Sequence, residues 1–153
     1  MKFLEYQVKE RFRSVGIPVP DGRVAKTPDE VALAAGALGP VAVKAQVPVG
    51  GRGKAGGIKL AATAAEAKRV GGEILGMTIK GFRVKEVLCE VAQEITRELY
   101  LGLTLDRDAR KPVLILSAQG GMEIEEVAET HPEAIARLYR TRGMAHSGSR
   151  FVT

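Results

Sequence analysis

The sequence of 153 residues is 45% hydrophobic and 27% charged, with a formal net charge of +5, which is typical of a globular protein and not of a disordered or fibrous one. No apolar run approaches the roughly 20 residues of a transmembrane helix, and the single cysteine, Cys89, excludes an internal disulfide framework, so we expect a cytoplasmic protein without membrane association. Four of the arginines lie after residue 136, and the rest of the chain has 19 basic and 18 acidic residues. The excess positive charge therefore lies in a short tail, which does not favour nucleic acid as a partner.

The first half of the chain is predicted to alternate between helices and strands. Thr27 and Thr63 are each followed three residues later by a glutamate, Glu30 and Glu66, which is the capping-box pattern of a helix start. Strand-forming residues flank the glycine-rich stretch 46–57, which predicts a hairpin. The expected elements are a helix over 3–15, a strand over 22–25, a helix from 28 to about 38, strands over 41–47 and 57–61, and a helix from 63 to about 75.

The second half is predicted to be rich in strands. A polar turn over 106–111 separates two apolar segments, which indicates a hairpin. Strand pairings linked by tight turns favour an α+β class over a doubly wound parallel sheet. The expected elements are strands over 84–92, 98–106 and 112–117, a strand or a helix over 120–129, a short helix over 131–139, and a loose tail over 140–153.

The glycine-rich stretch has the sequence QVPVGGRGKAGG and contains the pattern GxGxxG. A dinucleotide-binding turn would continue into a helix, but a predicted strand follows here. A Walker loop would need Ser or Thr after its lysine, where this chain has Ala55. A glycine hairpin can present backbone N–H groups to a ligand, and Lys44, Arg52 and Lys54 add cationic donors that suit polyphosphate. Phosphate binding is therefore the hypothesis, and a basic hairpin without a ligand is the alternative.

Other polar residues carry weaker signals. Glu90 and Glu98 lie at predicted strand ends, where a carboxylate can accept hydrogen bonds from ribose or adenine, but an isolated glutamate of this kind is more often a solvated charge. His131, His146 and Cys89 are separated in the sequence and form no metal-binding motif, so no metal site is predicted within this chain.

Several segments together resemble the β-subunit family of succinyl-CoA synthetase (succinate–CoA ligase, ADP-forming), whose N-terminal portion is an ATP-grasp protein. The resemblance extends over about residues 3–139 in the family's order, and GGRGKAGG beside KAQV is far more specific than GxGxxG alone. The matching segments are LEYQVKERFRSVGIPVP, VAVKAQV, GGRGKAGGIKLA, ILGM, RELYLGLTLDR and QGGMEIEEVAE.

The resemblance implies an ATP-grasp fold, in which two α+β lobes clamp a nucleotide. It places the glycine-hairpin lobe at about 21–95 and part of the second lobe at 1–20 and 96–139, and it leaves 140–153 unmatched. At Pro20 it implies a preference for adenine over guanine nucleotides. The residues to which it assigns nucleotide binding are Lys44, Gly51, Arg52, Gly53, Glu90 and Glu98.

The family reaction converts ATP, succinate and CoA into ADP, phosphate and succinyl-CoA through a phosphohistidine on a partner α subunit. Neither His131 nor His146 is that histidine, and no catalytic residue is expected in this chain. The family's Mg²⁺ ligands are expected beyond its last residue. We therefore expect the chain to bind ATP or ADP as the nucleotide-binding part of the ligase without completing catalysis.

Two features of the sequence depart from the family. Pro48-Val49 stands where the family usually has His-Ala, and proline removes a backbone donor at the entry of the loop. The second departure is that the family's segments beyond the ATP-grasp portion are expected to lie outside this chain. These two departures leave an alternative function open: the chain could be a non-catalytic truncated paralogue that serves as a nucleotide-binding or subunit-docking module.

Overall fold

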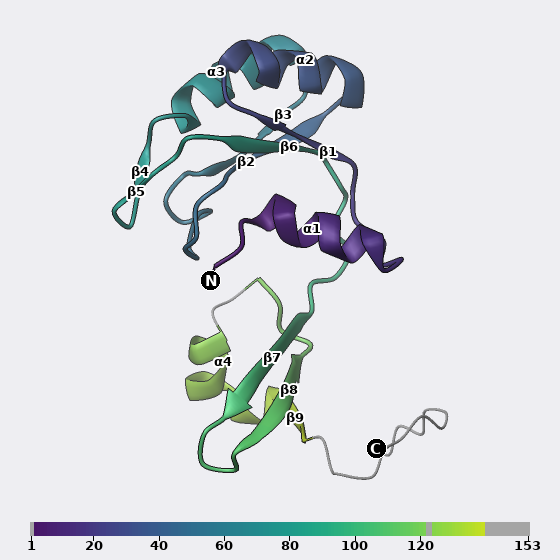
Figure 1. Ribbon diagram of the computed structural model, residues 1–153, viewed down its shortest axis with the longest axis vertical. Coiled ribbons are helices and arrows are strands. Elements are labelled where there is room, and N and C mark those ends of the chain that lie inside the picture. The colour runs from purple at the N-terminus through teal and green to yellow at the C-terminus, as the bar shows by residue number, and fades with distance from the viewer. Residues whose placement is uncertain (1, 122–123, 140–153) are drawn as a thin grey trace. The chain divides into compact units, whose positions relative to one another are not determined.

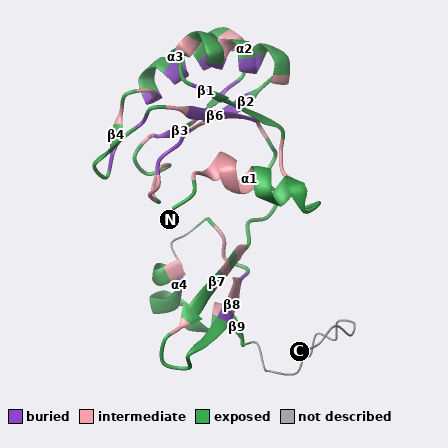
Figure 2. Cartoon of the chain, viewed as in Figure 1, coloured by how far each residue is buried: buried purple, intermediate pink, exposed green. Residues whose placement is uncertain are grey.

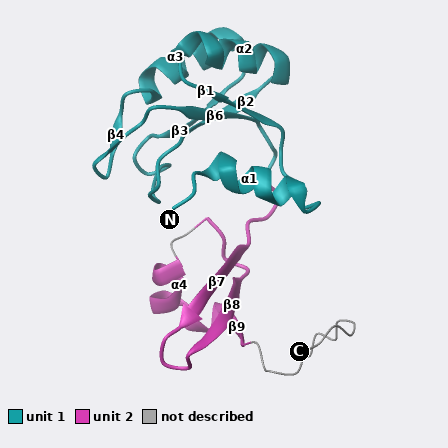
Figure 3. Cartoon of the chain, in the orientation of Figure 1, with its two compact units in different colours: residues 1–94 teal, residues 95–153 magenta. Residues whose placement is uncertain are grey.

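The computed structural model describes residues 2–121 and 124–139, and the chain divides into two compact units (Figure 3). Unit 1 is Met1–Glu94 and unit 2 is Ile95–Thr153. Unit 1 contains α1 (Glu5–Ser14), β1 (Gly22–Ala25), α2 (Pro28–Leu38), β2 (Val41–Ala45), β3 (Ile58–Ala61), α3 (Ala64–Ile74), β4 (Thr78–Ile79), β5 (Phe82–Arg83) and β6 (Val87–Val91). Unit 2 contains β7 (Tyr100–Asp106), β8 (Lys111–Ser117), α4 (Ile124–Thr130), the 3₁₀ turn η1 (Pro132–Ala134) and β9 (Ile135–Tyr139).

Unit 1 is built around a four-stranded sheet in the order β1-β6-β2-β3, with every neighbouring pair antiparallel. Helices α2 and α3 cover one face of this sheet (Figure 1). Val41, Val43, Val87 and Cys89 share a cluster of buried apolar residues with both helices, and the purple segments of Figure 2 mark this buried layer. Because side chains alternate between the faces of a strand, the intervening residues, Lys44 among them, lie on the other face.

Helices α2 and α3 begin where the capping pattern predicts. The hydroxyl oxygens of Thr27 and Thr63 accept hydrogen bonds from the backbone N–H groups of Glu30 and Glu66, each at 3.2 Å. Such caps satisfy N–H groups that have no partner inside the helix. The predicted helix starts are confirmed at both positions.

The two helices pack closely at Gly71 of α3. A Cβ atom at Gly71 would lie 2.8 Å from Cγ2 of Val31 on α2, which is closer than real side chains approach. The neighbouring Gly72 is exposed, and a Cβ there would meet only Cγ of Pro28 at 3.8 Å. Gly71 therefore weakens the helix locally but permits the contact between the helices.

A short hairpin of β4 and β5, which the sequence analysis did not predict, follows α3. Thr78 pairs with Arg83 and Ile79 with Phe82. Lys80 and Gly81 form the turn, with φ values of +48° and +84°. Two-residue strands are too short for an alternating pattern to be recognised.

Helix α1 belongs to unit 1. Glu5 and Lys9 of this helix form ion pairs with Lys44 of β2 and Glu90 of β6. These pairs explain why the helix forms one compact unit with residues 21–94. The predicted division into lobes, with residues 1–20 and 96–139 as part of the second lobe, stays a prediction.

Unit 2 is built on a three-stranded antiparallel sheet in the order β7-β8-β9. The predicted hairpin of β7 and β8 is confirmed. The segment 120–129, for which a strand or a helix was predicted, contains most of helix α4. On β7, the side chains of Leu101, Leu103 and Leu105 are exposed. All strand pairs of both units are antiparallel in the part of the chain that the structure describes, in agreement with the predicted α+β class.

The helix predicted over 131–139 is wrong. Residues 132–134 form only a 3₁₀ turn, and β9 pairs with the edge of β8, with Ile135 opposite Ser117 and Tyr139 opposite Val113. The hydrogen bonds offered by the β8 edge outweigh the helical propensity of Ala136, Arg137 and Leu138, because propensity is a weak preference that tertiary context overrides. The predicted tail 140–153 lies outside the described residues.

Candidate functional site

Lys44 and Glu90 meet on the face of the unit 1 sheet that α2 and α3 do not cover. Strands β2 and β6 pair with Ala42 opposite Glu90 and Lys44 opposite Leu88, so Lys44 and Glu90 are diagonal neighbours on one face. Lys44 Nζ donates a hydrogen bond to Oε2 of Glu90 across 46 positions of the sequence. Glu90 is only 4% exposed, and the strand register thus supplies a buried carboxylate with a cationic partner.

Helix α1 adds one acid and one base to this pair. Glu5 and Lys9 are one helical turn apart and form an ion pair at 3.1 Å. Oε1 of Glu5 also lies 3.3 Å from Nζ of Lys44, and Lys9 Nζ donates to Oε1 of Glu90. Each carboxylate therefore contacts both lysines, and each lysine contacts both carboxylates.

Arg52 connects the glycine-rich stretch to the same group of charges. Its Nη1 donates to the carbonyl oxygen of Ala45 at 3.0 Å, at the end of β2. The same nitrogen lies 2.7 Å from Oε2 of Glu5. We call Glu5, Lys9, Lys44, Arg52 and Glu90 the charge cluster.

The pKa shifts in the charge cluster favour the ionised forms. Burial by itself would raise the pKa of Glu5, but the charges of Lys44 and Arg52 outweigh it and lower this pKa to about 2. Burial acts to lower the pKa of Lys44, but its hydrogen bond to Glu90 and the charge of Glu5 outweigh that effect and raise this pKa. Three cations then face two carboxylates, and the surplus positive charge favours an anion at this place.

The loop that follows β2, residues 50–57, has a defined turn structure. Gly51 and Gly56 adopt φ values of +78° and +75°, which side chains other than glycine rarely permit. The N–H groups of residues 55–57 donate back to the carbonyl oxygens of residues 51–53. Among the residues that the structure describes, none accepts a hydrogen bond from the N–H groups of residues 50–54. These donors are available to an anionic ligand.

Pro48 and Val49, where the resemblance implies a departure from the family, lie just before these donors. Val49 is half-buried and packs against the apolar core of unit 1. Pro48 has no N–H group, but it precedes the segment 50–54 whose N–H groups are available. Val49 therefore anchors the entry of the loop, and Pro48 lies outside the segment 50–54 that carries the donors.

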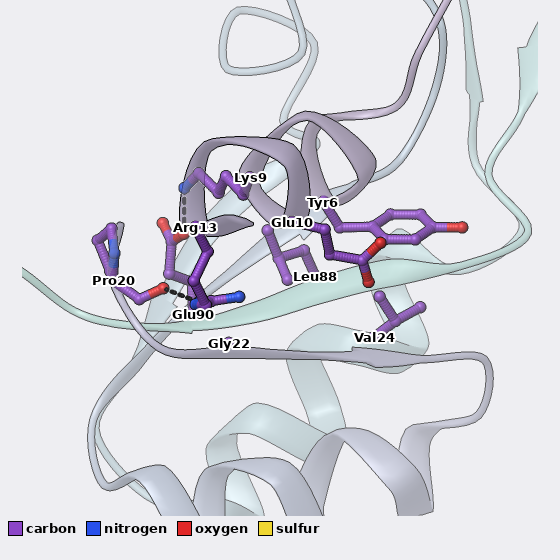
Figure 4. A pocket seen from close by; sticks show the side chains of 9 residues that line it. All are labelled: Tyr6, Lys9, Glu10, Arg13, Pro20, Gly22, Val24, Leu88 and Glu90. Carbon is purple, nitrogen blue, oxygen red and sulfur yellow. Dashed lines mark hydrogen bonds and ion pairs between the residues drawn. The ribbon is translucent and has the colours of Figure 1, made fainter. Parts of the chain in front are cut away.

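A pocket of about 250 Å³ lies beside the charge cluster, between α1, β1 and β6 (Figure 4). Glu90 and Pro20 both line it, so the structure brings the predicted nucleotide-preference residue next to one of the predicted nucleotide contacts. Nη2 of Arg13 donates to the carbonyl oxygen of Pro20 at 3.3 Å. The remaining lining residues are Tyr6, Lys9, Glu10, Gly22, Val24 and Leu88.

Glu98 belongs to unit 2 and is described there by itself. It is exposed, and its carbonyl oxygen accepts a hydrogen bond from the N–H group of Gly120 at 3.2 Å. Together with residues 95–97 and 118–120, Glu98 lines an open pocket of about 450 Å³. Its predicted role as a nucleotide contact stays a prediction.

Of the predicted site residues, the structure brings together Lys44, Arg52 and Glu90, with Gly51 and Gly53 in the adjoining loop. Sequence reasoning missed two groups of residues that organise them. Glu5 and Lys9 showed only as charges on a helix, and their spacing of four was the available signal. Gln46 is buried and joins α1 to β2, because its Oε1 accepts from the N–H group of Tyr6 at 3.2 Å and its Nε2 donates to the carbonyl oxygen of Lys44 at 3.1 Å.

Neither a membrane-crossing helix nor a metal-binding cluster occurs within residues 2–121 and 124–139. No helix there is long and apolar enough to cross a membrane. No group of three or more His, Cys, Asp or Glu side chains there could hold a metal ion.

Comparison with known proteins gives matches over most of the chain. A family model described as an ATP-grasp domain matches residues 2–147. Over 138 residues the chain is 56% identical to a succinate–CoA ligase [ADP-forming] subunit beta of Natronomonas pharaonis, and over 139 residues it is 55% identical to that of Chloroflexus aggregans. Each alignment covers 90% of this chain and 36% of the relative, so the chain spans little more than a third of the length of these curated relatives.

A solved structure has a similar fold. It is a dinucleotide-forming acetyl-coenzyme A synthetase 1 of Ca. Korarchaeum cryptofilum in complex with coenzyme A, Ca-AMPCP and HgCl+, with a TM-score of 0.67 and 23% identity. The match covers 94% of this chain and 62% of that chain. At this identity the likeness shows a shared fold and no more.

Proposed function

Because the chain belongs to the ATP-grasp domain family and has its fold, we propose that Lys44, Arg52 and the loop of Gly51 and Gly53 bind the phosphates of ATP or ADP. One observation carries the proposal. Lys44 and Arg52 flank the same carboxylate, that of Glu5, at 3.3 and 2.7 Å, directly beside a loop with available N–H donors. Two cations and a row of backbone donors are the groups that recognise a polyphosphate.

Glu5 defines how the phosphate would bind. Its carboxylate is an anion that neutralises Lys44 and Arg52 when no ligand is present. A polyphosphate carries more charge and more acceptor oxygens than one carboxylate, so it competes with Glu5 for both cations. Glu90 keeps its contacts with Lys9 and Lys44 and holds the lysine in position.

The remaining predicted residues extend this site. We assign Glu90 a second role as an acceptor for ribose or adenine, because it lines the pocket of about 250 Å³ that also contains Pro20. The apolar ring of Pro20 offers no donor or acceptor side chain to a base, which is consistent with the predicted preference for adenine. Glu98 is proposed as a further nucleotide contact from unit 2.

For the whole protein, we propose an ADP-forming succinate–CoA ligase, because the relatives from N. pharaonis and C. aggregans carry that name. We propose the cytoplasm as its location. The chain would supply the nucleotide-phosphate site to an assembly with an α-type partner, which would carry the phosphohistidine. Mg²⁺ would be held by protein groups other than the described residues of this chain. No described residue of this chain is assigned a step in making or breaking the thioester.

The proposal is tested by titrating the chain with ATP and with ADP in a calorimeter. We expect Lys44→Ala to weaken binding by about 10-fold or more, the usual cost of losing one charge-assisted contact. Lys59→Ala is the matched control, because Lys59 lies on the adjacent strand β3 and pairs with Glu73 of α3 at 2.6 Å. Circular dichroism of both variants checks that the fold is kept.

Two results would contradict the proposal. One is the absence of binding at millimolar nucleotide. The other is an equal loss of affinity in Lys44→Ala and Lys59→Ala. Capture of a stable partner by a chain that binds no nucleotide would instead support the alternative function, a subunit-docking module.

A further inference from the structure

We propose that Lys80, in the turn between β4 and β5, is an additional phosphate-binding residue of the glycine loop. The inference rests on the proposed function and adds a residue that neither the sequence motifs nor the relatives' names assign. Nζ of Lys80 lies 3.2 Å, and its Cε 3.4 Å, from the position that a Cβ atom would have on Gly51. The ammonium group therefore occupies the space that the missing side chain of Gly51 leaves open.

The β4–β5 hairpin is anchored on this loop by an apolar contact. Ile79, the residue before Lys80, is 1% exposed. Its Cδ1 lies 2.7 Å from the position that a Cβ atom would have on Gly57. The hairpin thus contacts the glycine loop twice, with an aliphatic side chain near the end of the loop and with a cation at its first turn.

The charge of Lys80 is not compensated by the protein in the part that the structure describes. Lys44 and Arg52 share the carboxylate of Glu5, but no Asp or Glu of the described residues lies within ion-pair distance of Lys80. A cation held beside available N–H donors and without an acidic neighbour is suited to an anion. The phosphate groups of a nucleotide have the charge and the acceptor oxygens to contact both the lysine and the loop.

The backbone of Lys80 also distinguishes it from an ordinary surface lysine. Its φ of +48° lies in the left-handed region, which is strained for a residue with a Cβ. Glycine and asparagine adopt this conformation more readily. A substitution to glycine therefore removes the ammonium group and relieves the turn, and the unfolding temperature separates a loss of binding from a loss of folding.

The test measures binding of sodium tripolyphosphate and of ADP to the whole chain by calorimetry. We compare Lys80→Gly, Lys80→Arg and the control Arg83→Ala with the unmodified chain. Arg83 is on the same hairpin, but its Nη2 lies near Gly76, 3.8 Å from the position of a Cβ atom there. Unfolding temperatures of all variants are measured in parallel, and that of Lys80→Gly is expected to equal or exceed that of the unmodified chain.

We expect Lys80→Gly to weaken the binding of both ligands by about 5- to 10-fold. Lys80→Arg should retain most of the affinity, and Arg83→Ala should change it by less than about 2-fold. Unchanged affinity in Lys80→Gly, with binding intact in the unmodified chain, would overturn this inference alone. An equal loss in Arg83→Ala would also overturn it, because the effect would then reflect net charge. If the unmodified chain binds neither ligand, the proposed function itself is wrong.

Discussion

Glu5 on α1 and Lys44 on β2 form an ion pair of 3.3 Å across 39 positions of the sequence. The same carboxylate contacts Arg52 at 2.7 Å. One acid thus holds the two cations that the proposed function assigns to phosphate. Under the proposed function, Glu5 would compete with the ligand for these cations as well as support the fold.

We expect Glu5→Gln to increase the affinity for ADP by about 5-fold, because it removes a competing negative charge from Lys44 and Arg52. Calorimetric titration at low salt, where screening is weak, measures the change. Glu73→Gln is the control, since Glu73 is an acid on α3 that pairs with Lys59 and Arg69. A lower affinity in Glu5→Gln would show that Glu5 positions the cations for phosphate and does not compete with it.

The dependence of stability on pH should report the same ion pairs. The pKa of Glu5 is lowered from 4.5 to about 2, so its ionised form stabilises the folded state above about pH 4.5, and this contribution is lost as the pH falls toward 2. Glu5→Gln lacks the contribution at every pH. We therefore expect the difference in free energy of unfolding between the unmodified chain and Glu5→Gln, measured by urea unfolding, to shrink as the pH falls from 5 to 2.5. A constant difference over this range would refute the assignment.

Two adjacent glycines of α3 should respond in opposite directions to alanine. In Gly71→Ala the new Cβ would overlap with Val31 at 2.8 Å, so we expect a loss of about 1–2 kcal/mol, because overpacking costs more than helix propensity gains. In Gly72→Ala the nearest atom is at 3.8 Å, so we expect no loss and up to about 1 kcal/mol of gain. Urea unfolding of both variants measures the difference, and equal effects would contradict the close packing of α2 on α3.

Cys89 should be unreactive in the folded protein. It is buried in the core of unit 1, and burial raises the pKa of its thiol to about 11. Since the thiolate is the reactive form, labelling with a thiol reagent at pH 8 should proceed only as fast as the protein opens. Adding urea should accelerate the labelling in step with unfolding. Rapid labelling of the native chain would contradict the burial of this strand.

Much of unit 1 could be predicted because its signals are local. The capping residues Thr27 and Thr63 predicted the helix starts, and the strand-forming residues on both sides of the glycine stretch predicted the β2–β3 hairpin. The resemblance to the β-subunit family of succinate–CoA ligase, which rested on longer motifs such as GGRGKAGG, is confirmed by relatives at 55–56% identity. Local patterns and long motifs were thus enough to predict the fold class, whereas the nucleotide-binding role of the loop residues stays a prediction.

The features that were missed depend on contacts between distant segments. The strand Ile135–Tyr139 exists because β8 offers an edge, which no pattern within the segment reveals. The importance of Glu5 and Lys9 depends on how α1 lies against β2 and β6. The closeness of Lys80 to Gly51 depends on a hairpin with strands of two residues, too short to be recognised in the sequence.

The strand order of unit 1 has a consequence for how the site assembles. The hairpin of β2 and β3 involves residues close in the sequence. Strand β6 starts only at Val87, well after the hairpin ends at Ala61, and must insert between β1 and β2 at a larger cost in loop-closure entropy. Lys44 therefore lies in a segment that can form early, and Glu90 in the strand that completes the sheet. During synthesis on the ribosome, the cationic loop would exist before its buried counter-charge, and the charge cluster would form as the sheet closes.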